Sequence, residues 1–77
     1  MEDKELGILI IDDDPIYRKL SGSILKDRFN VFTAETPSAG FDMLKTLKID
    51  FVICDYRLPE MNGLEVLERI KQNYPHV

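Results

Sequence analysis

The fold expected for this chain is decided by residues 6–15, which read LGILIIDDDP. This range is apolar almost without interruption up to Ile11, a pattern typical of a strand that is buried on both faces in a parallel sheet. Asp14 followed by Pro15 is typical of a helix N-cap with proline at the first helical position. The stretch therefore predicts a buried strand, an acidic strand end, and then a helix that ends near Phe29.

The same order of an apolar run, a turn signal and a helical pattern recurs twice downstream. Residues 31–34 are of the β-branched and aromatic type, and Thr36 followed by Pro37 repeats the cap-and-proline signal ahead of a second helix. Residues 51–54 form a third, wholly apolar run, and residues 64–74 carry apolar side chains three and four positions apart. We therefore expect a βαβαβα chain with parallel strands, right-handed crossovers and helices on both faces of the sheet.

The composition is that of one small soluble domain. The 77 residues carry 10 Lys and Arg against 14 Asp and Glu, which gives a formal net charge of −4. We therefore expect these 77 residues to form one small domain and not a two-domain enzyme. The acidic balance argues against nucleic-acid binding, because phosphate neutralisation needs a basic stripe.

The compartment is also indicated by the sequence. One cysteine, Cys54, cannot form an internal disulfide, and the apolar runs are too short to span a membrane. Residues 1–4 lack the basic and then apolar layout of a signal peptide. We therefore expect a cytoplasmic protein with no membrane contact.

Acidic residues follow two of the predicted strands at the point where each strand ends. Asp12, Asp13 and Asp14 follow the first strand, and Asp55 follows the third. Because the carboxyl ends of adjacent parallel strands meet at one edge, about 5 Å apart per strand step, the four carboxylates are expected to converge. Such a cluster is costly unless protons or a cation relieve the repulsion, and oxygen donors suit Mg²⁺.

Each acidic residue also has a purely structural interpretation. Asp14 is expected to serve mainly as a helix cap. Asp12 and Asp13 alone could be a solvated strand end, and Asp55 alone could begin a turn. Joint placement of the acids at one edge favours the metal site, since neither group helps the core. Zinc is disfavoured because the chain holds one Cys and one His, far apart in sequence.

The loop at residues 55–63, DYRLPEMNG, resembles the phosphorylation loop of response-regulator receiver domains, Asp-x-x-Leu/Met-Pro-x-Met-Asn/Asp-Gly, with every specified position filled. Residues 8–15 resemble the opening strand of the same family with its acidic pair. The resemblance implies an α/β, flavodoxin-like, doubly wound parallel sheet of strand order 2-1-3-4-5. Residues 1–77 are then expected to be the N-terminal part of a single receiver domain, truncated to βαβαβα.

The resemblance also implies roles for individual residues. Asp55 matches the phosphoacceptor, Asp12 and Asp13 match the Mg²⁺-binding acids, and Arg57 matches the position whose backbone carbonyl completes the metal shell. The phosphoryl group would come from a phosphohistidine of a sensor histidine kinase or a histidine phosphotransfer protein, which would dock near residues 15–18. The implied function is that of a phosphoacceptor in two-component signal transduction, which assists its own phosphorylation and dephosphorylation and is not otherwise an enzyme.

Two further working residues of the family have no match in this chain. A Ser or Thr after strand four and a Lys after strand five are expected beyond Val77. Lys48 cannot replace that lysine, because it precedes the third strand and so belongs to the opposite edge of the sheet. The cognate kinase, the signal and the type of output domain are left open by the sequence.

Two alternatives remain open at this point. The acidic run that begins at Asp12 also resembles the Asp-x-Asp opening of haloacid-dehalogenase-like phosphohydrolases, with Asp12 as the nucleophile, although residues 58–63 are then unexplained. A third hypothesis is a phosphorylation-independent interaction module. In that case the third strand, exposed as a sheet edge, would associate with a second copy to form a homo-oligomer, or the two copies would swap elements.

Overall fold

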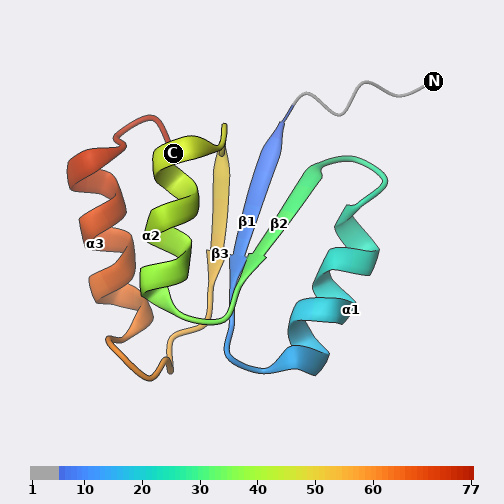
Figure 1. The fold of residues 1–77 in the computed structure, drawn as a ribbon, viewed down its shortest axis with the longest axis horizontal. Helices are drawn as coiled ribbons and strands as arrows, with labels where there is room; N and C mark the ends of the chain where they lie inside the picture. Colours follow the sequence, from blue (N-terminus) through green and yellow to red (C-terminus); the bar gives the residue numbers. More distant parts are fainter. Residues whose placement is uncertain (1–5) are drawn as a thin grey trace.

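Three parallel strands alternate with three helices along residues 6–77, the part of the chain that the structure, a computed structural model, describes (Figure 1). The elements are β1 (Gly7–Ile11), α1 (Pro15–Leu25), β2 (Asn30–Ala34), α2 (Pro37–Thr46), β3 (Phe51–Cys54) and α3 (Gly63–Asn73). The predicted βαβαβα order is confirmed. Residues 1–4, for which no signal peptide is expected, lie outside the described residues.

β1 lies at the centre of the sheet, whose strand order is β2-β1-β3. Both pairings are parallel, and Ile11 at the end of β1 lies opposite Ala34 in β2 and Cys54 in β3. All five residues of β1 are buried, which is what its continuous apolar sequence requires of a central strand. This is the order expected for the first three strands. It places the residues after β1 and β3 side by side at one edge of the sheet.

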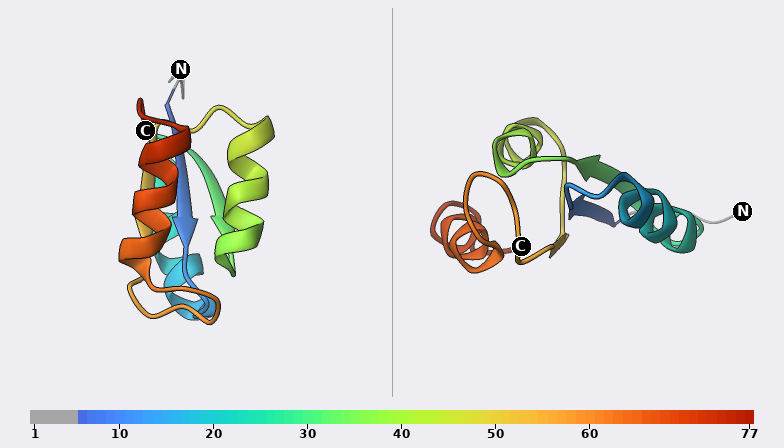
Figure 2. Two further views of the ribbon diagram at one scale, coloured as in Figure 1. Left: turned by 90° about the vertical axis from the view of Figure 1, so that its left-hand side faces the viewer. Right: turned by 90° about the horizontal axis from the view of Figure 1, so that it is seen from below.

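Two helices cover one face of the sheet and one helix covers the other. α2 and α3 lie on the same side, whereas α1 packs on the opposite side against β1 and β2 (Figure 2). The larger core fills the space between the sheet and helices α2 and α3. Its buried residues are Leu9, Ile11, Ala34, Leu44, Ile49, Val66 and Ile70. Burying side chains of this size contributes about 1.5–3 kcal/mol each, so this layer holds α2 and α3 in place.

α1 begins where the sequence predicts and ends earlier. The Asp14 side chain accepts a hydrogen bond from the backbone N–H of Ile16, which confirms the predicted N-cap. The prediction of a helix end near Phe29 is wrong, because α1 ends at Leu25. Residues 26–28 form turns instead, and the N–H of Asn30 already donates to the Leu6 carbonyl at 2.9 Å as β2 begins. The pairing of β2 with β1 therefore ends α1 at an earlier residue than the local sequence pattern predicts.

The face of the sheet on the α1 side is only partly covered. Phe51 and Ile53 of β3 are 48% and 47% exposed, and Ile16 and Ile24 of α1 are 74% and 68% exposed. Within residues 6–77, β3 is thus an edge strand with apolar side chains open to solvent, as the interaction hypothesis expects. Every helix in the same part of the chain is too short or too polar to traverse a bilayer.

Candidate functional site

Three carboxylates meet at the carboxyl edge of the sheet. Asp12 and Asp13 follow β1, Asp55 follows β3, and one oxygen from each of the three lies within 4.8 Å of the other two. Backbone hydrogen bonds extend the strand pairing to this point, from the Asp12 N–H to the Ala34 carbonyl at 3.0 Å and from the Asp55 N–H to the Ile11 carbonyl at 2.9 Å. The register of the sheet therefore sets the spacing of the acids.

The fourth acid, Asp14, is used for structure. Its carboxylate caps α1, and its backbone N–H donates to Oδ1 of Asp12 at 2.9 Å. The expected convergence of four carboxylates therefore reduces to three that can share a ligand, with Asp14 orienting Asp12. This outcome agrees with the structural interpretation of Asp14 as a helix cap.

Arg18 is a contributor to the site that sequence reasoning considered only as part of a docking surface. From the first turns of α1 its Nη1 donates to the backbone carbonyl of Asp12 at 2.9 Å. Within residues 6–77 its guanidinium forms no ion pair with an acid, so Arg18 contributes by holding the backbone at Asp12. The sequence signal is weak, because a six-residue separation lies outside the ordinary helical pair spacing of three or four.

The acids line an open hollow of about 440 Å³. Its lining residues are Asp12, Asp13, Asp14, Tyr17, Asp55 and Arg57. Within the described residues, the carboxylates of Asp13 and Asp55 accept no hydrogen bond and form no ion pair. Their oxygens are therefore available to a ligand that enters the hollow.

The loop that follows Asp55 closes tightly on its own start. The Gly63 N–H donates to the Tyr56 carbonyl at 2.8 Å. A Cβ at Gly63 would lie 2.7 Å from the Asp55 carbonyl oxygen and 2.9 Å from Cα of Tyr56, so only glycine fits. Asn62 then caps α3 in a capping box with Glu65. The start of α3 thus fixes the backbone of Asp55.

Cys54, immediately before Asp55, is a half-buried side chain without a disulfide partner. Burial, followed by the negative charges of Asp55 and Asp12, raises the pKa of the Cys54 thiol to about 11. The thiol is therefore protonated at neutral pH, and Cys54 acts as a small packing residue.

Comparison of the chain with known proteins identifies the family to which it belongs. The family model for the response regulator receiver domain matches residues 8–77. The chain belongs to the receiver family. The acids at positions 12, 13 and 55 all lie within the matched residues.

Two curated relatives resemble the receiver chain over nearly its whole length. The transcriptional regulatory protein GlrR of Escherichia coli (strain K12) is 36% identical over 76 residues, which cover 97% of this chain and 17% of GlrR. Protein-glutamate methylesterase/protein-glutamine glutaminase 2 of Vibrio vulnificus (strain YJ016) is 32% identical over 78 residues, which cover 97% of this chain and 23% of that protein. The chain thus spans less than a quarter of each relative.

Solved receiver structures share the fold. A response regulator receiver domain protein from Clostridium thermocellum superposes with a TM-score of 0.85 at 31% identity, over 94% of this chain and 60% of that one. The response regulator protein TrrA from Thermotoga maritima, in complex with Mg²⁺-BeF, gives a TM-score of 0.84 at 30% identity, over 91% of this chain and 62% of TrrA. The flavodoxin-like fold is therefore confirmed.

The family membership decides between the phosphoacceptor and the phosphohydrolase hypotheses. Receiver domains are phosphoacceptor modules of two-component signalling proteins, and the matched region is this module even where a relative is named as an enzyme. The comparisons give no support to the haloacid-dehalogenase alternative with Asp12 as nucleophile.

Proposed function

We propose that Asp55 is the phosphoacceptor of this receiver and takes its phosphoryl group from a phosphohistidine of a sensor histidine kinase or a histidine phosphotransfer protein. The observation that carries the proposal is the meeting of the Asp12, Asp13 and Asp55 carboxylates within 4.8 Å at the carboxyl edge of the sheet. A carboxylate oxygen of Asp55 forms the new P–O bond as the P–N bond to the donor imidazole breaks. The imidazole nitrogen keeps the electron pair and takes a proton from water. The acyl phosphate is later hydrolysed, which resets the switch.

The donor set suits Mg²⁺. It consists of oxygens only, from three carboxylates in an open hollow, and Mg²⁺ prefers oxygen ligands together with retained waters. Asp12, Asp13 and Asp55 would hold the ion together with the backbone carbonyl of Arg57. Bound Mg²⁺ supplies positive charge that reduces the repulsion between the carboxylates and the phosphoryl oxygens. The TrrA complex with Mg²⁺-BeF supports the same chemistry in a relative.

The residues of this chain supply orientation. The Asp14 N–H holds one oxygen of Asp12, and Arg18 holds the Asp12 carbonyl. Gly63 brings the start of α3 against the backbone of Asp55. These contacts hold the Asp12 carboxylate and the backbone from which the Asp55 side chain projects, which reduces the reorganisation needed during phosphoryl transfer.

The donor is proposed to dock on the start of α1, residues 15–18, next to the hollow. Pro15 and Ile16 are exposed there, and Tyr17 lines the hollow itself. A cytoplasmic location fits a partner that carries phosphohistidine and agrees with the composition of the chain. The domain is proposed to contact neither membrane nor nucleic acid.

The phosphoacceptor is tested by mass spectrometry after incubation with acetyl phosphate or a donor kinase and Mg²⁺. The wild-type chain is expected to gain one phosphoryl mass that is stable in acid and labile in base. Asp55→Asn is expected to lose it, whereas Asp27→Asn, which changes an exposed acid in the turn after α1, retains it. Full labelling of Asp55→Asn overturns the proposal.

A second candidate role, self-association, is favoured by the exposed edge of β3. Phe51 and Ile53 are each nearly half exposed on a strand whose outer backbone groups are unpaired within residues 6–77. Edges of this kind pair readily with other strands. We infer that copies of the 77-residue chain, studied by itself, associate through β3.

A further inference from the structure

One backbone N–H group in the first turn of α2 has no hydrogen-bond acceptor within its own helix. Thr36 is the N-cap: its Oγ1 accepts from the Ala39 N–H at 3.2 Å, and its carbonyl accepts from the Gly40 N–H at 3.1 Å. Pro37 has no N–H to satisfy. The Ser38 N–H is thus the one donor in this turn that its own helix and cap leave open.

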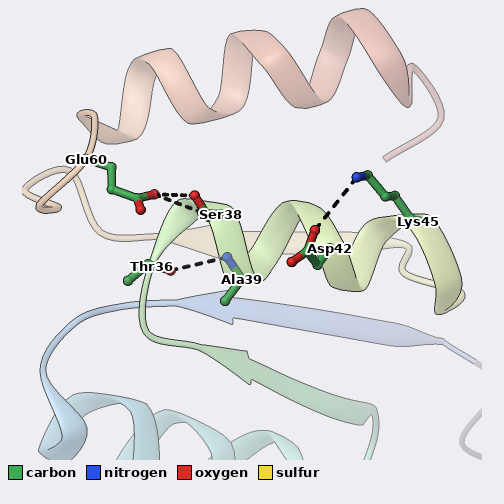
Figure 3. Close-up of polar contacts among 6 residues, drawn as sticks. All are labelled: Thr36, Ser38, Ala39, Asp42, Lys45 and Glu60. Carbon is green, nitrogen blue, oxygen red and sulfur yellow. Dashed lines mark hydrogen bonds and ion pairs between the residues drawn. The ribbon is translucent and has the colours of Figure 1, made fainter.

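Glu60 supplies the missing acceptor from a loop that lies 22 residues further along the chain. Its Oε1 accepts from the Ser38 N–H at 3.0 Å and from the Ser38 hydroxyl at 2.8 Å. Figure 3 shows the Glu60 side chain extending from the loop after β3 to the first turn of α2. A carboxylate at this position is also favoured by the partial positive charge of a helix N-terminus.

The contact ties together two strand ends that are not neighbours. Glu60 lies in the loop after β3 and Ser38 lies just after β2, while β1 separates these strands in the sheet. The contact lies on the face of the sheet that α2 and α3 cover, between the loop that leads into α3 and the first turn of α2. The loop that follows Asp55 is therefore held to the first turn of α2.

Glu60 also provides the one polar side-chain anchor for the middle of this loop. Within the described residues, no other side chain from positions 56–61 makes a hydrogen bond or ion pair to another element. Leu58 and Met61 contribute apolar contacts with the core. Arg57, whose carbonyl is the proposed metal ligand, lies three residues before Glu60.

We propose that Glu60 is a positioning residue for phosphoryl transfer: by docking on Ser38 it holds the Arg57 carbonyl and the backbone after Asp55 at the edge of the acid cluster. This inference rests on the proposed function of Asp55. Glu60 touches neither the acids nor the phosphoryl group, and it acts through the loop backbone.

The test compares Glu60→Ala, which removes the acceptor, with Glu60→Gln, which keeps an oxygen that can accept both hydrogen bonds. Glu68→Ala is the matched control, because it removes the same charge from an exposed position on α3. Mg²⁺ affinity is measured by titration calorimetry, the phosphorylation rate with acetyl phosphate at saturating Mg²⁺, and amide exchange of residues 56–61 without metal. All are measured well below the melting temperature of each variant.

Glu60→Ala is expected to weaken Mg²⁺ binding and to slow phosphorylation, each by about three- to tenfold, because an exposed charge-assisted contact is lost. Amide exchange over residues 56–61 is expected to be faster in Glu60→Ala than in the wild type. Glu60→Gln is expected to recover most of the lost Mg²⁺ affinity and phosphorylation rate, and Glu68→Ala is expected to match the wild type in both. A lower melting temperature in Glu60→Ala with unchanged Mg²⁺ affinity and phosphorylation rate would show a structural cap only and would overturn the inference. If the wild type takes no phosphoryl group at Asp55, the proposed function fails, and Mg²⁺ affinity and amide exchange still decide the role of Glu60.

Discussion

Gly63→Ala is expected to damage both the stability and the site, and the structure sets the size of the effect. The new Cβ would lie 2.7 Å from the Asp55 carbonyl oxygen, about 0.7 Å short of the 3.4 Å at which ordinary contact begins. A second close approach, 2.9 Å to Cα of Tyr56, is also to backbone. Backbone cannot rotate away as a side chain can, so the loop or the start of α3 must move.

Two energy terms compete in this variant. Overpacking costs about 1–3 kcal/mol, whereas alanine in a helix gains up to about 1 kcal/mol over glycine. The clash therefore wins, and we expect the free energy of unfolding to fall by about 1–2 kcal/mol. A shift of several tenths of an ångström at Asp55 is expected to slow phosphorylation by about tenfold or more, since a 1 Å misplacement can cost about 100-fold.

The assays are urea unfolding followed by far-ultraviolet circular dichroism and the rate of phosphorylation by acetyl phosphate. Gly22→Ala is the matched control, because a Cβ at Gly22 in α1 meets only Cγ1 of Val31, at an ordinary 3.7 Å. It is expected to stabilise the protein by about 0.5–1 kcal/mol and to leave phosphorylation unchanged. If Gly63→Ala is as stable as the wild type, or is phosphorylated as fast, the inference that Gly63 fixes Asp55 is refuted.

Two other predictions concern the cap of α1 and the β3 edge. Asp14→Ala is expected to lower the free energy of unfolding by about 1 kcal/mol because the Ile16 N–H loses its acceptor, and Asp14→Asn, which keeps a capping oxygen, should retain most of the stability in urea unfolding. Ile53→Lys is expected to abolish concentration-dependent association in sedimentation velocity, since it places a charge on the exposed face of an edge strand. A wild-type chain that sediments as a monomer at every concentration contradicts the self-association role.

Local sequence signals account for most of the fold. The strands are predictable because their apolar runs are short and bounded, and α1 and α2 because a capping side chain followed by proline is a strong start signal. The end of α1 was not predictable, since nothing local distinguishes Leu25 from Phe29. The chain leaves the helix in order to reach the register in which Asn30 pairs with β1, which is a tertiary requirement.

The site divides in the same way. The proximity of the three carboxylates could be predicted from the sequence, because they follow strands whose order was predictable. The contacts of Arg18 and Glu60 could not be predicted from the sequence, because each depends on the position that the end of a long side chain reaches in the folded protein. Pro37 offers a partial signal, since it leaves the Ser38 N–H as a donor that needs an acceptor, but it does not say which residue supplies one.

The hydrogen bonds around the acids hold the backbone of this edge of the sheet and leave two of the carboxylates without a partner in the described residues. The backbone is held closely: Asp12 and Asp55 extend the strand pairing, and Gly63 closes the loop. The carboxylates are treated differently, since within residues 6–77 those of Asp13 and Asp55 have no hydrogen-bond or ion-pair partner. Three acids this close repel one another and add nothing to the core, so they weaken the free domain. A rigid backbone with unsatisfied carboxylates is the arrangement that a ligand from outside the chain completes, which is why its stability should rise with Mg²⁺ concentration.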